Sequence, residues 1–150
     1  MFKETTWREG ELKVQEFMKK QGYNILWTNF SCVGVELDIV ALLPKSVQIK
    51  KVKDEYNQKI LSDKANKKIY KSSMKSFIKT LSDIIIITEV KARETDKYGL
   101  GMDAISDYKK ENIKRGARFL QVDKNLGKYQ IRFDVASVDN GKITYIENAF

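Results

Sequence analysis

The stretch SDIIIITEVKARE, from Ser82 to Glu94, decides how the rest of the sequence is interpreted. Its four consecutive isoleucines are apolar on both faces of an extended chain, which is typical of a central strand. The strand then continues into Glu89, Lys91 and Arg93, although burying a charge without a partner costs much free energy. Glu89 and Lys91 are two residues apart and therefore point to the same side. Either the strand ends there in a salt bridge, or these charges meet other groups that need them.

Several other charged residues stand where the sequence pattern predicts an apolar residue. The full set comprises Glu11, Glu36, Asp38, Glu89, Lys91 and Lys109. Two of them interrupt the apolar stripes of helices predicted over about 7–21 and 102–120, and the others lie in predicted strands. Carboxylates brought together in a fold repel one another unless a cation joins them. We therefore predict that these groups converge around Mg²⁺ or Mn²⁺, hard cations that prefer oxygen ligands.

The order of the predicted elements indicates an α/β protein with a mixed β-sheet flanked by helices. A capping box at Thr6–Glu9 predicts that the first helix starts at Trp7. The Asp-Asn-Gly turn at 139–141 predicts a hairpin between the last two strands. Alternation places Glu36 and Asp38 on one face of the second predicted strand. The first three strands are predicted over 22–30, 33–42 and 84–91.

A lysine-rich segment at about 44–83 is predicted to be a helical insert in a single domain that spans residues 1–150. It contains 11 Lys and four acidic residues, a net charge of +7, whereas the whole chain carries +8. We predict a helix over about 58–81, preceded by a short extension of the second strand over 46–52. The basic face of this helix either binds phosphate backbones or is simply solvated. The candidate nucleic-acid contacts are Lys67, Lys71 and Lys75 on that face, together with Arg93.

The composition excludes several classes of enzyme and site. The chain has no histidine, which rules out Ser-His-Asp triads, HExxH proteases and histidine-held metals. Its single cysteine, Cys32, excludes an internal disulfide and a Cys-rich zinc site. No apolar run approaches the roughly 18 residues of a membrane span, and the first ten residues lack the apolar segment of a signal peptide. We therefore expect a cytoplasmic protein without a membrane partner.

Hydrolysis of a phosphodiester is the chemistry that suits the remaining carboxylates and lysines. It needs an activated water and neutralised charge on the phosphoryl oxygens, and a divalent metal supplies both. Asp38 and Glu89 would hold the ion, helped by the main-chain carbonyl of Val90. Lys91 would orient the attacking water or stabilise the transition state. Glu11 and Glu36 would bind a second ion or a metal-bound water. Lys109 would neutralise a carboxylate or contact the scissile phosphate.

The segments GELKVQEFMKKQGYNILWTNF, ELDIVA, EVKAR, RFDV and IENAF resemble the YraN-like family of uncharacterised bacterial proteins. That family is assigned to the PD-(D/E)xK nuclease superfamily and is similar to the archaeal Holliday-junction resolvases. The resemblance covers about 7–41 and 84–150. It implies a restriction-endonuclease-like core and Mg²⁺-dependent endonuclease activity on DNA. By analogy with the resolvases, it also implies branched or structured substrates, such as junctions or flaps, and a homodimer.

The resemblance assigns roles to individual positions. It matches Leu37-Asp38 to the "PD" pair, Glu89-Val90-Lys91 to "ExK", Glu11 to the first-helix acid and Lys109 to the polar residue of the following helix. The chain departs from the family pattern at the insert, at Val35, which replaces a glycine, and at Ser31, which replaces an arginine.

Two other functional classes stay open. A non-catalytic nucleic-acid-binding protein could use the same fold, and an interaction module could use the apolar face of the insert as a docking helix. Nucleic-acid binding through the insert would weaken steeply with salt, whereas docking through an apolar face would not. Individual residues also have structural interpretations. Asp38, Glu89 and Lys91 could form a salt-bridged strand end, and Lys109 could extend its ammonium into solvent.

Overall fold

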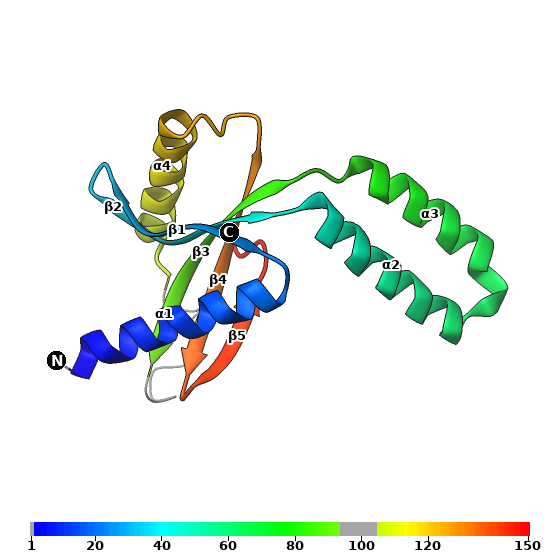
Figure 1. The fold of residues 1–150 in the computed structure, drawn as a ribbon, viewed down its shortest axis with the longest axis horizontal. Coiled ribbons are helices and arrows are strands. Elements are labelled where there is room, and N and C mark those ends of the chain that lie inside the picture. Colours follow the sequence, from blue (N-terminus) through cyan, green and yellow to red (C-terminus); the bar gives the residue numbers. More distant parts are fainter. Residues whose placement is uncertain (1, 94–104) are drawn as a thin grey trace.

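The computed structural model describes residues 2–93 and 105–150, in which five strands form one sheet with helices on both faces (Figure 1). The elements in chain order are α1 (Phe2–Lys20), β1 (Asn24–Cys32), β2 (Val35–Leu43), α2 (Lys45–Ser62), the short 3-10 helix η1 (Lys64–Asn66), α3 (Lys67–Thr80), β3 (Ile84–Arg93), α4 (Asp107–Asp123), β4 (Gln130–Asp139) and β5 (Lys142–Ile146). Helices α1 and α4 cover opposite faces of the sheet, where they pack in two separate cores.

Strand β3 lies at the centre of the sheet, as its run of isoleucines predicts. The strand order is β1-β2-β3-β4-β5. β3 runs parallel to β4, whereas the other neighbouring pairs are antiparallel. The prediction of an α/β protein with a mixed sheet flanked by helices is confirmed, and the arrangement is compatible with a restriction-endonuclease-like core.

The isoleucines of β3 explain how the sheet holds helices on both faces. Ile86 packs in the core beneath α1, together with Val14 and Met18 of that helix. Ile85 and Ile87 pack in the other core, against α4. Burying one such side chain contributes about 1.5 to 3 kcal/mol relative to leaving it exposed. A strand that is apolar on both faces therefore joins the two cores.

Strand β2 changes its facing pattern at Asp38. Val35 and Leu37 pack in the core against α4, whereas Ile39 and Ala41 pack in the core beneath α1. Uninterrupted alternation predicts that all four side chains lie on one face of β2, and this prediction is wrong. The pairing of β2 with β3 extends only as far as Ile39. Asp38 therefore lies at the point where β2 separates from its neighbour.

The ends of the first elements differ from the predicted ones. Helix α1 starts at Phe2, so Thr6 lies inside the helix and the predicted capping box does not form its beginning. Strand β2 starts at Val35 because Val33 and Gly34 form the turn after β1, with φ of 44° and 75°. Glycine adopts such a conformation without steric cost, and this accounts for Gly34 at the turn.

Helix α4 starts later than the predicted Met102. Residues 102–104 lie outside the described part of the chain, and the helix spans Asp107–Asp123. Ser106 is its N-cap, and the Ser106 hydroxyl accepts a hydrogen bond from the Lys109 N–H at 3.1 Å. A serine before a helix is a start signal that the predicted boundary overlooked.

Residues 46–52 are helical, so the predicted strand extension is wrong. Pro44 precedes α2 with φ −65° and ψ 145°, and its carbonyl accepts bonds from the N–H groups of Val47 and Gln48. Proline suits a helix start because the missing N–H would have had no partner there. The predicted single helix over 58–81 is instead the end of α2, followed by η1 and α3.

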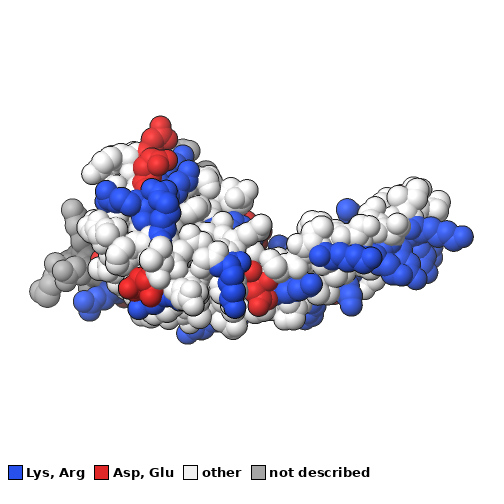
Figure 2. Space-filling view, turned by 90° about the horizontal axis from the view of Figure 1, so that it is seen from above, with Lys and Arg blue, Asp and Glu red and all other residues white. Residues whose placement is uncertain are grey.

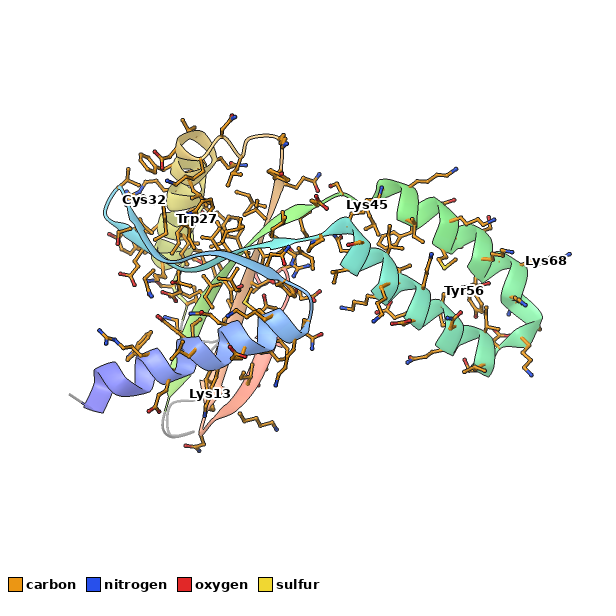
Figure 3. The ribbon with its side chains drawn as sticks, in the orientation of Figure 1. Lys13, Trp27, Cys32, Lys45, Tyr56 and Lys68 are labelled. Carbon is orange, nitrogen blue, oxygen red and sulfur yellow. The ribbon has the colours of Figure 1, made fainter. Side chains whose placement is uncertain are left out.

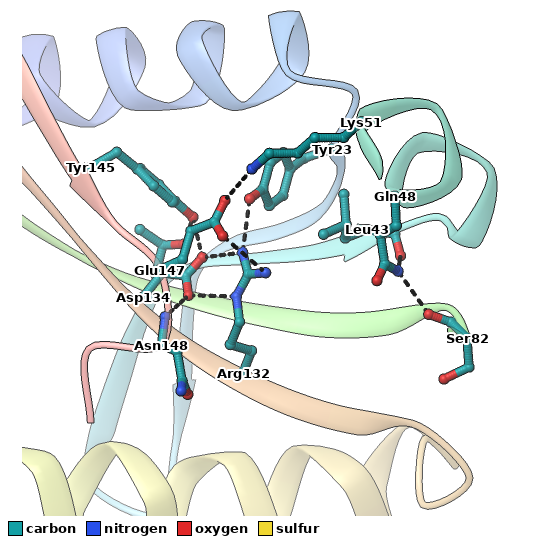
Figure 4. Close-up of polar contacts among 11 residues, drawn as sticks. Tyr23, Leu43, Gln48, Lys51, Ser82, Arg132, Asp134, Tyr145, Glu147 and Asn148 are labelled. Carbon is teal, nitrogen blue, oxygen red and sulfur yellow. Dashed lines mark hydrogen bonds and ion pairs between the residues drawn. The ribbon is translucent and has the colours of Figure 1, made fainter. Parts of the chain in front are cut away.

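Helices α2 and α3 form a hairpin that extends away from the sheet (Figure 1). Polar bonds close its base. The Lys45 N–H donates to Asp83 Oδ1 at 2.6 Å. Gln48 Nε2 donates to the Ser82 carbonyl at 2.7 Å (Figure 4). No residue of α2 or α3 is buried, so the hairpin contributes little to the core. Within the two described ranges, every helix is too short or too polar to cross a membrane.

Candidate functional site

The structure brings Asp38 of β2 and Glu89 of β3 together. Both residues are buried, with exposed fractions of 8% and 4%, and their carboxyl groups lie within hydrogen-bonding reach of each other. Asp38 Oδ2 also accepts a hydrogen bond from the Val90 N–H at 2.8 Å. The Val90 N–H of β3 lies beyond the last residue pair between β2 and β3, and the Asp38 side chain accepts its hydrogen bond there. Val90 contacts Asp38 through its N–H, and its carbonyl as a metal ligand stays a prediction.

Asp38 favours its protonated form in this environment. Burial raises the pKa of Asp38, and the adjacent Glu89 charge raises it further, to about 8, against the opposing effect of the Val90 N–H. Asp38 therefore keeps its proton near neutral pH in the absence of a cation. A pair of this kind is what a bound cation would stabilise in its fully ionised form.

Two lysines from different elements converge on one oxygen of Glu89. Lys91 Nζ lies 3.7 Å and Lys109 Nζ lies 3.4 Å from Glu89 Oε1. Glu89 and Lys91 thus share one side of β3, as their spacing predicts. Lys109 is in the first turn of α4 and its side chain is 43% exposed, so it is not centred on a buried stripe as predicted. The arrangement places two ammonium groups beside a buried carboxylate pair.

Glu11 interacts electrostatically with the same pair, and Glu36 interacts with Glu11. Burial raises the pKa of Glu11, a hydrogen bond with the Asn29 side chain opposes this, and the charges of Glu36 and Glu89 raise it further. Glu36 is exposed on β2. The charge of Glu11 in turn raises the pKa of Asp38. The four predicted carboxylates therefore form one interacting group, with two at its centre and two around it.

The donor set at the centre suits a hard cation with few protein ligands. Among residues 2–93 and 105–150, no three Asp, Glu or Cys side chains lie close enough to hold a metal ion together. Mg²⁺ is commonly bound by one or two carboxylates, and it keeps several waters that substrate phosphates can replace. Asp38 and Glu89 fit that pattern, and the pKa of Asp38 is raised by burial first and by the nearby Glu89 charge second. Their role as metal ligands stays a prediction.

The predicted nucleic-acid contacts lie apart from this group. Lys67, Lys71 and Lys75 are exposed on α3, in the hairpin. Figure 3 shows Lys68 of the same helix near the tip of the hairpin, far from the sheet. The hairpin leaves the sheet at Ile84, and five strand residues, about 17 Å, separate Ile84 from Glu89. The side chain of Arg93 lies outside the described part of the structure.

A second polar cluster lies beneath α1, and sequence reasoning assigned it no role (Figure 4). Its centre is Asp134 of β4, which is fully buried. The Asp134 carboxylate accepts bonds from Arg132 Nε and Nη2 at 2.8 and 2.7 Å, from the Tyr145 hydroxyl at 2.6 Å and from the Asn148 N–H at 2.9 Å. Arg132 and Asp134 are two residues apart on one strand, which was the available sequence signal.

This second cluster is saturated and therefore structural. Burial alone would lower the pKa of the Arg132 guanidinium, but its bonds and charge interaction with Asp134 outweigh burial and raise that pKa. Arg132 Nη2 also donates to the Tyr23 hydroxyl at 2.8 Å, and Nη1 lies 3.7 Å from Glu147. The cluster ties Tyr23, which precedes β1, to β4, β5 and the C-terminal segment. Both oxygens of its buried carboxylate already accept hydrogen bonds, so it has no free oxygen to offer a metal.

Comparison with other proteins places the chain in a family. The sequence profile of Uncharacterised protein family UPF0102 matches residues 10–138. A UPF0102 protein of Clostridium acetobutylicum is 32% identical over 147 residues, which cover 94% of this chain and 89% of that protein. UPF0102 proteins of Alkaliphilus metalliredigens and Persephonella marina are 28% and 27% identical, over 94% and 100% of this chain and 93% and 97% of theirs. None of these names states an activity. The chain therefore belongs to Uncharacterised protein family UPF0102, the YraN family that its motifs resemble.

Proposed function

We propose that this protein is a metal-dependent endonuclease that hydrolyses phosphodiester bonds in DNA. The observation that carries the proposal is the contact between the buried carboxyl groups of Asp38 and Glu89, with Lys91 and Lys109 on the same Glu89 oxygen. A binding surface for nucleic acid needs exposed cations and has no use for two buried acids. The motif resemblance to the PD-(D/E)xK nucleases supports the same conclusion.

In this proposal Asp38 and Glu89 hold Mg²⁺ or Mn²⁺, helped by the Val90 carbonyl. When bound, the metal supplies Lewis acidity toward a phosphoryl oxygen and a water. Lys91 lies beside Glu89 with an exposed fraction of 20%, so its ammonium can face substrate and stabilise charge on the phosphate. Lys109 is more exposed and would contact the scissile phosphate or balance Glu89. Glu11 and Glu36 would bind outer waters or a second ion.

Substrate shape and assembly follow from the resemblance alone. By analogy with the resolvases, we propose branched or structured DNA, such as a four-way junction or a flap, as substrate. A homodimer would match the two-fold symmetry of a junction.

A non-catalytic nucleic-acid-binding protein is the second candidate. The observation that favours it is the pairing of Glu89 with two lysines, which neutralises this carboxylate without a metal. Such a protein would bind DNA equally well in Mg²⁺ and in EDTA and would leave every substrate intact.

One experiment separates the two candidates. Four-way junction, flap, single-stranded and linear duplex DNA are incubated with the protein in Mg²⁺, Mn²⁺ or EDTA. Glu89→Gln and Lys91→Gln are tested beside Glu111→Gln and Lys114→Gln, which change an exposed ion pair on α4. We expect metal-dependent cutting that falls about 100-fold or more in the first two variants and stays unchanged in the last two. If all five proteins bind alike and none cuts, the nuclease proposal is wrong.

A further inference from the structure

Helix α3 carries five lysines and no acidic residue. The other long helices mix their charges: α1 contains four acids, α2 two and α4 three. All five lysines of α3 are exposed: Lys67, Lys68, Lys71, Lys75 and Lys79. Within residues 2–93 and 105–150, none of them has an acidic partner within salt-bridge distance. Figure 2 shows groups of positive side chains along this face of the hairpin and few negative ones.

The spacing of these lysines is unfavourable for a helix in isolation. Lys67, Lys71, Lys75 and Lys79 follow one another at intervals of four residues, so each lies over the next on the same face. Like charges at this spacing repel and destabilise a helix. The row is about 18 Å long, with an ammonium about every 6 Å. One strand of a duplex carries about five phosphates over that length.

The apolar side of α3 is already used inside the hairpin. A hollow of about 210 Å³ between the two helices is lined by side chains of both, including Val52, Tyr56, Tyr70, Met74 and Phe77. Tyr70 Oη also donates to Asp63 Oδ2 at 2.9 Å, which secures the turn. None of the lysines in the row lines this hollow, and all of them are exposed.

We propose that the lysine row of α3 binds the phosphate backbone of nucleic acid. Because the hairpin leaves the sheet at Ile84, five positions before Glu89 on β3, and extends away from the sheet, this surface contacts the backbone away from the proposed reaction centre. It therefore supplies affinity without sequence preference. The inference deepens the proposed function, since it names where substrate is held, but binding itself needs no cleavage.

An anionic membrane is the competing partner for a basic helix. A helix that lies in a membrane interface needs a free apolar face beside its lysines. In α3 most of that face packs toward α2. Its exposed large apolar side chains are Ile69 and Phe77, and Phe77 lines the hollow between the two helices. Nucleic acid, which needs only the charges, fits the surface better.

The test compares two triple variants that each lower the net charge from +8 to +5. The first is Lys67→Gln, Lys71→Gln and Lys75→Gln. The control is Lys13→Gln, Lys20→Gln and Lys142→Gln, which replaces three exposed lysines of α1 and β5, outside the hairpin. Circular dichroism checks that both fold, which the first should do because it loses like-charge repulsion.

Binding to a labelled duplex is measured in EDTA, so that no substrate is cut, at salt concentrations of about 50 to 200 mM. Three lost phosphate contacts lower the slope of log K against log salt by about 2.7, which means that wild type loses about 40-fold more affinity than the α3 variant over this range. The control variant should keep the wild-type slope.

Equal slopes for wild type and the α3 variant would overturn the inference, because the lysine row would then be only a solvated surface. Loss of binding to phosphatidylserine vesicles in the α3 variant, with DNA binding unchanged, would overturn it in favour of a membrane. Binding through α3 by a protein that cuts nothing would instead contradict the proposed function and leave this inference standing.

Discussion

Replacing Asp38 with Asn should remove a pH dependence of stability from the metal-free protein. Burial and the Glu89 charge raise the pKa of Asp38 from 3.8 to about 8. Between these values the unfolded chain has lost the proton and the folded chain keeps it. The folded state then binds more protons, so the free energy of unfolding must fall as pH rises. An Asn side chain can accept from the Val90 N–H and donate to Glu89, which mimics protonated Asp38 without titrating.

The size of the effect follows from the same values. A difference of one proton between the folded and unfolded states changes the free energy of unfolding by about 1.36 kcal/mol per pH unit. From pH 5 to pH 8 this gives at most about 4 kcal/mol for Asp38. Because the Asp38–Glu89 pair can relax or admit water, we expect roughly 2 to 4 kcal/mol.

The assay is urea unfolding in EDTA at both pH values. Wild type should lose this stability between pH 5 and pH 8, whereas Asp38→Asn should not. Asp54→Asn, which changes an exposed aspartate of α2, is the matched control and should follow wild type. Added Mg²⁺ should stabilise wild type at pH 8 and leave Asp38→Asn unchanged. The same pH dependence in wild type and Asp38→Asn would refute the reasoning, because Asp38 would then not keep its proton in the folded state.

Two further predictions concern the framework around the site. Asp134→Asn leaves the buried side of Arg132 without its charge partner, and it should destabilise the protein by about 3 to 5 kcal/mol in urea unfolding; a loss below about 1 kcal/mol would show that the cluster is not structural. Gly10→Ala adds a Cβ only 2.7 Å from the Ala92 Cβ, so α1 must shift away from β3. We expect a loss of about 1 to 3 kcal/mol in melting experiments, and an unchanged melting temperature would contradict the close packing of α1.

The sequence by itself determined the central strand and the meeting of its acids. Four isoleucines predict a strand buried on both faces, and β3 has its isoleucines in both cores. The charges at Asp38 and Glu89 interrupt otherwise apolar strands, and this interruption predicts that they meet. These inferences succeed because a buried strand has a characteristic local pattern of apolar residues, which can be recognised in the sequence.

Only the tertiary structure decided at which residues the local hydrophobic pattern no longer predicts the fold. The facing pattern of β2 breaks at Asp38 because the strand leaves β3 there, and alternation cannot report the end of pairing with a distant strand. Residues 46–52 are helical because they follow Pro44 and because Val47 packs from this helix against the core beneath α1, although their sequence also permits a strand. Asp134 acquires its partners from β4, β5 and the C-terminal segment. Periodicity describes one element at a time, whereas these features depend on contacts between elements that are far apart in the chain.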